Sequence, residues 1–182
     1  MSCIYVCPGG ATVYINITAG DQDDASPNNL AGTWEKIPEV LSWEIEADTD
    51  DPTTFRTADT NNVKIAACPG ATEFSATVTT KLCLDPAKFL YTLLFDSNTQ
   101  VDGWNVGANT YGATPLTTTG AWFYFTWSNA DPPGATPAPT DPGVYAHGKI
   151  TPPGFGLDND SDDAAEAEFG ITIDKGPFWP VL

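Results

Sequence analysis

The fold prediction starts from one alternating stretch, Thr72-Glu73-Phe74-Ser75-Ala76-Thr77-Val78-Thr79-Thr80-Lys81-Leu82-Cys83-Leu84. Its apolar residues fall on one face of an extended chain: Phe74, Ala76, Val78, Leu82 and Leu84. Most residues between them are polar: Glu73, Ser75, Thr77, Thr79 and Lys81. A period of two residues is typical of a strand that is buried on one side. The stretch therefore predicts a long strand with one face on a core.

The segment that follows this strand predicts a helix. Asp85 suits a helix N-cap, and Pro86 suits the first helical position, where its missing N–H would be unpaired anyway. Apolar residues then recur at helical spacing: Phe89, Leu90, Leu93 and Leu94. We expect a helix over about residues 86–96, packed on the face of a sheet.

Two other stretches alternate in the same way, Leu41 to Asp48 and Ala165 to Asp174. Leu41, Trp43, Ile45 and Ala47 are predicted to point inward, as are Ala165, Ala167, Phe169, Ile171 and Ile173. The outward rows are largely acidic: Glu44, Glu46, Asp48, Glu166, Glu168 and Asp174. Because like charges on neighbouring strands repel, these rows need an explanation. They indicate either a merely soluble surface or one that must not adhere to a polyanion.

The whole pattern predicts a mainly β protein, a β-sandwich or open barrel with one packed α-helix and long loops. We expect a single domain over residues 1–182, with an N-terminal hairpin or arm at 1–20, a long loop at 47–64 and an apolar tail at 176–182. The strand Ala121 to Trp127 is aromatic on both faces, so one face should fill the core and the other should meet the helix or a partner subunit.

Composition excludes several functions. The chain of 182 residues has a net charge of −17 and only seven Lys and Arg, so tight binding to DNA or to acidic membrane surfaces is not expected. No apolar stretch approaches the length of a membrane span. The start, Met1-Ser2-Cys3, lacks the features of a secretory signal, which favours an intracellular chain or one that leaves the cell inside a virion.

Metal and cofactor sites are weakly indicated, and we expect no cofactor. Cys3, Cys7, Cys68 and Cys83 leave a disulfide framework open, but reduced, partly buried thiols are favoured. Asp158, Asp160 and Asp162 resemble the start of a calcium loop. However, Asp163 stands where Gly is required and Phe169 where a bidentate Glu is required, so a solvated acidic loop is favoured.

No enzyme is predicted. His147 is the only histidine, and no Gly-x-Ser-x-Gly turn presents a nucleophile to it. Paired carboxylates of the glycosidase type will occur by chance in so acidic a chain.

The layout of the chain carries a resemblance. Thr33-Trp34-Glu35-Lys36-Ile37 leads into an alternating strand, and the long excursion from Asp48 to Asn62 follows. The turn Pro69-Gly70, the long strand and the helix from Pro86 come next, and His147-Gly148 and Asp174-Lys175-Gly176-Pro177 complete the pattern. In this order of elements, residues 30 to 178 resemble the phage major tail tube proteins.

That resemblance implies a structural virion protein of the viral tail, made in the host cytoplasm. Its subunits would form hexameric rings that stack into a tube and conduct DNA during ejection without binding it specifically. The tape measure, terminator and baseplate or tip proteins would be its partners. Asp50, Phe55 and Arg56 of the long loop would contact other subunits, as would Trp122 and Tyr124. Glu44, Glu46, Glu166 and Glu168 would face the lumen.

Two other classes stay open. A capsid decoration protein, or another virion component, would also be β-rich but would form trimers or monomers and no tube. A carbohydrate-binding β-sandwich module would expose coplanar Trp rings and gain stability from calcium or glycans.

Overall fold

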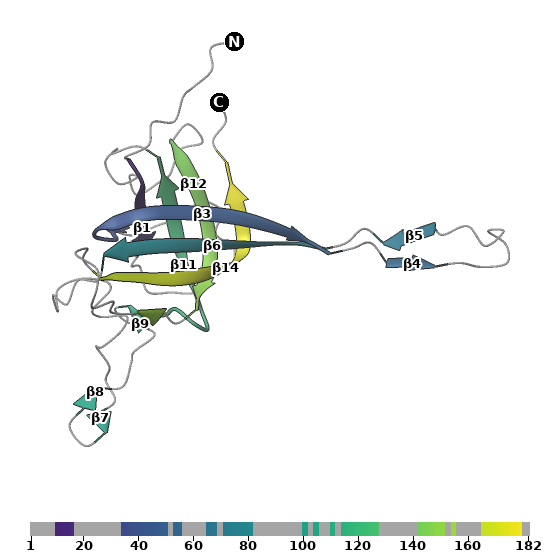
Figure 1. Cartoon of the computed structure of the whole chain (residues 1–182). Coiled ribbons are helices and arrows are strands. Elements are labelled where there is room, and N and C mark those ends of the chain that lie inside the picture. Colours follow the sequence, from purple (N-terminus) through teal and green to yellow (C-terminus); the bar gives the residue numbers. More distant parts are fainter. Residues whose placement is uncertain are drawn as a thin grey trace, which may run out of the picture.

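Figure 1 shows the chain as a computed structural model. It describes residues 10–16, 34–50, 71–81, 116–127, 142–151 and 165–179, together with the backbone of short strands between these ranges. Every regular element in this described part is a strand, which confirms the mainly β class. The helix predicted over residues 86–96 lies outside the described residues, as do residues 1–9 and 17–20 of the predicted N-terminal hairpin or arm.

The main sheet is antiparallel throughout, with the strand order β2-β1-β11-β12-β14-β6-β3 and with β13 paired to β14 beside this path. Its strands are β1 Thr12–Asn16, β2 Trp34–Lys36, β3 Val40–Thr49, β6 Thr72–Lys81, β11 Ala121–Thr126, β12 Gly143–Ile150, β13 Gly154–Phe155 and β14 Glu166–Phe178. Three small ladders lie outside it: β4 Thr53–Phe55 with β5 Ile65–Cys68, β7 Gln100–Val101 with β8 Trp104–Asn105, and β9 Thr110–Tyr111 with β10 Thr114–Pro115.

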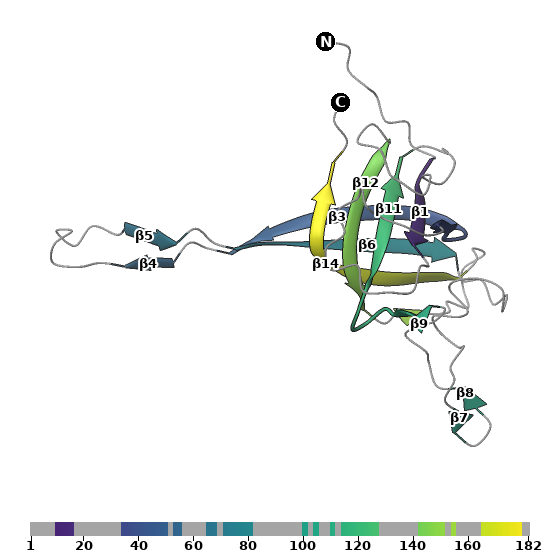
Figure 2. The same cartoon turned by 180° about the vertical axis from the view of Figure 1, so that it is seen from behind.

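Strand β14 joins two halves of this sheet. Residues 166–173 pair with β6, while residues 171–178 pair with β12. Figures 1 and 2 show the result: β3, β6 and the first part of β14 cross over β1, β11 and β12. We call the first group, with β13, the acidic half, and the second group, with β2 and the end of β14, the aromatic half. The sheet thus folds over on itself.

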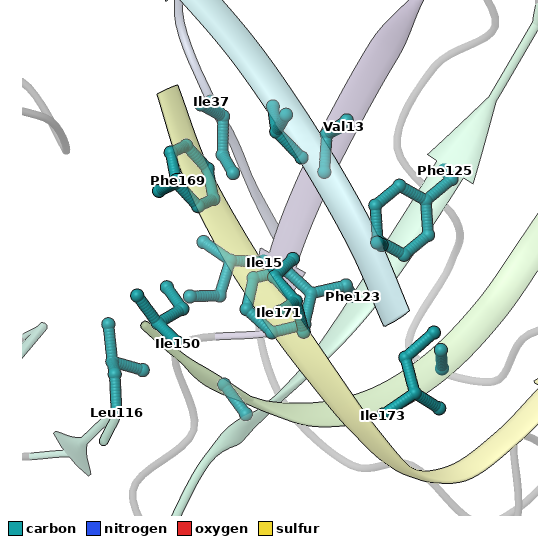
Figure 3. Close-up of a cluster of buried hydrophobic side chains, with 14 of the residues drawn as sticks. Val13, Ile15, Ile37, Leu116, Phe123, Phe125, Ile150, Phe169, Ile171 and Ile173 are labelled. Carbon is teal, nitrogen blue, oxygen red and sulfur yellow. The ribbon is translucent and has the colours of Figure 1, made fainter. Parts of the chain in front are cut away.

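The hydrophobic core fills the space between the two halves (Figure 3). The aromatic half contributes Val13, Ile15, Phe123 and Phe125, and the acidic half contributes Val78, Phe169 and Ile171, each at most 1% exposed. Removal of this apolar surface from water is the main stabilising contribution, at about 25 cal/mol per Å².

Trp43 of β3 connects the halves directly. Its indole N–H donates to the carbonyl oxygen of Thr126 on β11 at 3.1 Å. Its ring centroid lies 5.7 Å from that of Phe125. Because both contacts run from β3 to β11, they hold the crossing strands together at one point.

Glycine is required where β12 and β14 approach each other. A Cβ on Gly148 would lie 2.5 Å from Ile171 Cγ2 and 2.6 Å from the backbone oxygen of Thr172. Any side chain there would push β14 away from β12. At the turn that enters β11, Gly120 has φ +77°, which only glycine adopts readily.

The predicted alternation is confirmed over most of the long strands. Ala76 and Val78 of β6 and Ala167, Phe169 and Ile171 of β14 are buried, as predicted.

The predictions for Leu41 and Ala47 are wrong. Leu41 is 41% exposed, because a β-bulge between Val40 and Ser42 makes it the extra residue of its strand. Ala47 is exposed near the end of β3, where β3 and β6 run past the other strands (Figure 1). The predicted tail is also partly strand, since Phe178 at the end of β14 pairs with Tyr145 of β12.

Candidate assembly surfaces

The exposed face of the acidic half gathers the acidic rows. Glu44 lies opposite Thr77 and Glu46 opposite Ser75 on β6, while on the other side of β6 Glu168 lies opposite Thr79. The carboxylates on this surface, here called the acidic face, are Glu44, Glu46, Asp48, Glu73, Glu166 and Glu168, all exposed. One lysine, Lys81, faces Glu166 across the strands. The four residues predicted to face a lumen therefore share one surface.

Two strand edges flank the acidic face. In the described part of the chain, β3 pairs only with β6, and β13 pairs only with β14. Within these described residues, the acidic half thus has the strand order β13-β14-β6-β3, and each end of this order presents an unpaired strand edge. Unpaired strand edges are templates for pairing with another chain.

The long excursion after β3 is partly strand. β4 and β5 pair beyond the ends of β3 and β6, and Figure 1 shows this ladder well away from the core. Asp50 at its root is exposed, and its N–H donates to the carbonyl oxygen of Ala71 at 2.9 Å. Phe55 lies at the end of β4 opposite Ile65, and the predicted contact residue Arg56 lies outside the described residues. We call Asp50 and the β4–β5 ladder the arm.

The face of the aromatic half that points away from the core is also buried within one chain. Trp122 and Tyr124 are 2% and 1% exposed and belong to a cluster with Tyr14, Trp34 and Tyr145. The Tyr124 and Tyr145 rings stack with centroids 4.4 Å apart. Trp122 and Tyr124, which are predicted to contact another subunit, therefore already pack against their own chain. Their role toward another subunit stays a prediction.

His147 holds the bulged end of β14. Its Nδ1 lies 2.5 Å from Asp174 Oδ1, and its ring packs edge-on to Trp122 with centroids 5.5 Å apart. The pairing between β12 and β14 shifts on both sides of His147. Through these contacts, His147 on β12 positions the end of β14.

A small apolar patch follows this site. Phe178 at the end of β14 is 39% exposed, and Trp179 just after it is 60% exposed. The Phe178 ring lies 5.9 Å from that of buried Trp122, so the patch continues the aromatic cluster outward.

The described residues include no group of three or more His, Cys, Asp or Glu side chains arranged to hold a metal ion. The calcium candidates Asp158, Asp160 and Asp162 lie outside the described residues. Among the tryptophans whose side chains are described, Trp34 and Trp122 are buried, Trp43 and Trp127 are partly buried, and Trp179 alone is exposed. In that part of the chain, therefore, no pair of exposed indole rings forms a platform for a sugar.

No helix in the described ranges is long and apolar enough to cross a membrane.

Sequence reasoning missed the edge strand β13 and the exposed pair Phe178 and Trp179. The signal for β13 is faint, because Pro152-Pro153-Gly154 is typical of a loop. The apolar tail did contain a signal, because Phe178 and Trp179 are two adjacent large aromatic side chains.

No protein-family model and no curated protein matches this chain. Several solved structures are similar to it. The tail of an empty gene transfer agent particle is 8% identical, with 91% of each chain covered and a TM-score of 0.46. The SPP1 tail tube is 12% identical over 93% of this chain and 76% of that chain, with a TM-score of 0.47.

A third similar structure comes from an extracellular contractile injection system, the PVC sheath–tube complex in its extended state. It is 13% identical over 94% of this chain and 88% of that chain, with a TM-score of 0.46. All three of these structures are tail, tail tube or sheath–tube assemblies.

Proposed function

We propose that this chain is a structural, non-enzymatic subunit of a viral tail tube. The observation that carries the proposal is the acidic half itself: a four-stranded section with a carboxylate-rich exposed face and, among the described residues, an unpaired edge on each side. The two edges belong to different strands, β3 and β13. A contact between unlike edges is heterologous, and such contacts close into rings when the rotation between copies allows it.

The second layer supports one orientation of the ring. The face of the acidic half opposite to the acidic face packs on the aromatic half through the shared core. In a closed ring, the outer circumference offers more room than the inner one, so the aromatic half belongs outside. The acidic face then lines the lumen, with Glu44, Glu46, Glu166 and Glu168 on the wall. Following the sequence resemblance, we propose six copies to a ring.

A lumen of this kind suits the passage of DNA. Carboxylates repel phosphates within a Debye length of about 8 Å at physiological ionic strength, so DNA slides without being held. The arm, with Asp50 and Phe55, extends past the core and would reach a neighbouring subunit or ring (Figure 1). Terminator, tape measure and tip proteins would meet the ends of the stack.

Electron microscopy of the purified protein, alone and with the tail-tip proteins from the same virion, tests the proposal. We expect rings or tubes with a central hole, and a reconstruction in which the acidic face lines that hole. A protein that stays monomeric with those proteins present would overturn the proposal. Trimers without a lumen would instead support a capsid decoration protein.

A further inference from the structure

Strand β3 offers a long edge to other chains. It spans ten residues, and in the described part of the chain its side away from β6 has no partner strand. Such an edge pairs readily with any strand that approaches it, including the same edge of a second copy. A subunit that must form rings needs to avoid that symmetric contact. The contact would occupy the β3 edge of each copy, so the assembly would end at two chains.

The register of a symmetric contact can be worked out from the strand. Two β3 strands related by a two-fold axis pair antiparallel, and side chains on the same face lie opposite each other. If Ile45 lies opposite Ile45, Glu44 of one copy faces Glu46 of the other, and the reverse pair repeats by symmetry. A shift by two residues brings Glu46 opposite Glu46, or Glu44 opposite Glu44. Every central register therefore sets carboxylates against carboxylates, which destabilises the pair.

The β13 edge differs in this respect. Gly154 of β13 lies opposite Glu168 of β14, so it occupies a position on the acidic-face side of the register. Glycine brings no side chain and no charge to that position. A β13 strand from another copy can thus lie along β3 without setting a carboxylate from this position against Glu44 or Glu46.

From these two edges we propose that the acidic row on β3 selects its partner: it rejects the β3 edge of a second copy and accepts the β13 edge. This selection rests on the proposed tube function and adds the rule by which the copies join. The row thereby does two things at once, since the same carboxylates would line the lumen after closure.

Neutral, isosteric variants test the rejection. E44Q/E46Q removes two charges from the edge strand, and E166Q/E168Q removes two charges from the same face on β14, which pairs with β6 along these residues. Sedimentation velocity is measured at about 0.01 M and about 0.15 M ionic strength, where the Debye length is about 30 and about 8 Å.

At the lower salt, E44Q/E46Q is expected to form a species that stops at two chains, with an association constant about tenfold above wild type, or about 1.4 kcal/mol. The control E166Q/E168Q is expected to match wild type. Equal dimerisation of both variants would show a bulk charge effect and overturn the selection, as would an E44Q/E46Q protein that forms no dimer.

A second pair of variants tests acceptance at the other edge. G154E places a carboxylate on the β13 edge, and G154Q adds a side chain of the same size without charge. We expect G154E to lower the yield of rings at least tenfold relative to G154Q under identical conditions, and equal yields would overturn the selection. The proposed function fails separately, if wild type forms no rings with its tail-tip proteins while E44Q/E46Q still dimerises.

Discussion

Two glycine-to-alanine substitutions on adjacent strands should have opposite effects on stability. Gly148 on β12 and Gly170 on β14 both lie within the main sheet. A methyl group at Gly148 would meet Ile171 Cγ2 at 2.5 Å and the backbone oxygen of Thr172 at 2.6 Å. A methyl group at Gly170 would meet only the side chain of Thr151, at 3.6 Å or more.

The first contact cannot relax cheaply. Ile171 is 1% exposed, and the other close atom is backbone, so β14 itself has to move away from β12. Overpacking of this kind costs about 1–3 kcal/mol. At Gly170 the methyl group fits, and the loss of unfolded-state freedom is expected to stabilise the fold by about 0.4–1 kcal/mol. The two variants should thus differ in the free energy of unfolding by about 1.4–4 kcal/mol.

Urea unfolding of wild type, G148A and G170A, followed by tryptophan fluorescence, measures this difference. In thermal unfolding, a chain of this size would show the same difference as a gap of roughly 3–16 °C in Tm, at about 2–4 °C per kcal/mol. G170A serves as the matched control for the loss of a glycine from a strand. If G148A were as stable as G170A, the close approach of β12 and β14 would be wrong.

Two further predictions concern the connection between the halves and the acidic face. Trp43→Phe removes the indole donor to β11 and should lower the free energy of unfolding in urea by about 1 kcal/mol. The control Trp179→Phe, at a 60% exposed position, should lower it by less than about 0.5 kcal/mol. Equal losses in the two variants would contradict the role given to Trp43. E44K/E46K/E166K/E168K replaces four of the six carboxylates of the acidic face by lysine and should give binding to double-stranded DNA in low-salt gel-shift assays that weakens steeply with salt. Wild type and E44Q/E46Q/E166Q/E168Q should show none, and DNA binding by wild type would contradict the non-adhesive face.

Local pattern predicted the strands well because burial on one side imposes a period of two. It predicted the buried faces of β6 and β14, and it failed at Leu41, where a bulge changes the parity. The bulge follows a turn in which Glu39 has φ +54°, and neither feature is specified by local hydrophobicity.

The candidate site was only half predictable. The sequence identified two acidic rows, but whether they share a surface depends on β6 lying between β3 and β14, which is a long-range pairing. The end of β14 was predicted as a tail because Gly176 and Pro177 usually interrupt a strand. Here they lie within the register shift between Tyr145 and His147, where Tyr145 pairs with Phe178 and His147 pairs with Lys175.

The sharing of β14 between the two halves also determines how the molecule comes apart. Residues 171–173 hold hydrogen-bonded neighbours on both sides, β6 and β12. Neither layer can peel away without breaking the ladder of the strand on which the other depends. The two layers should therefore melt as one cooperative unit, with a single transition seen by every spectroscopic probe.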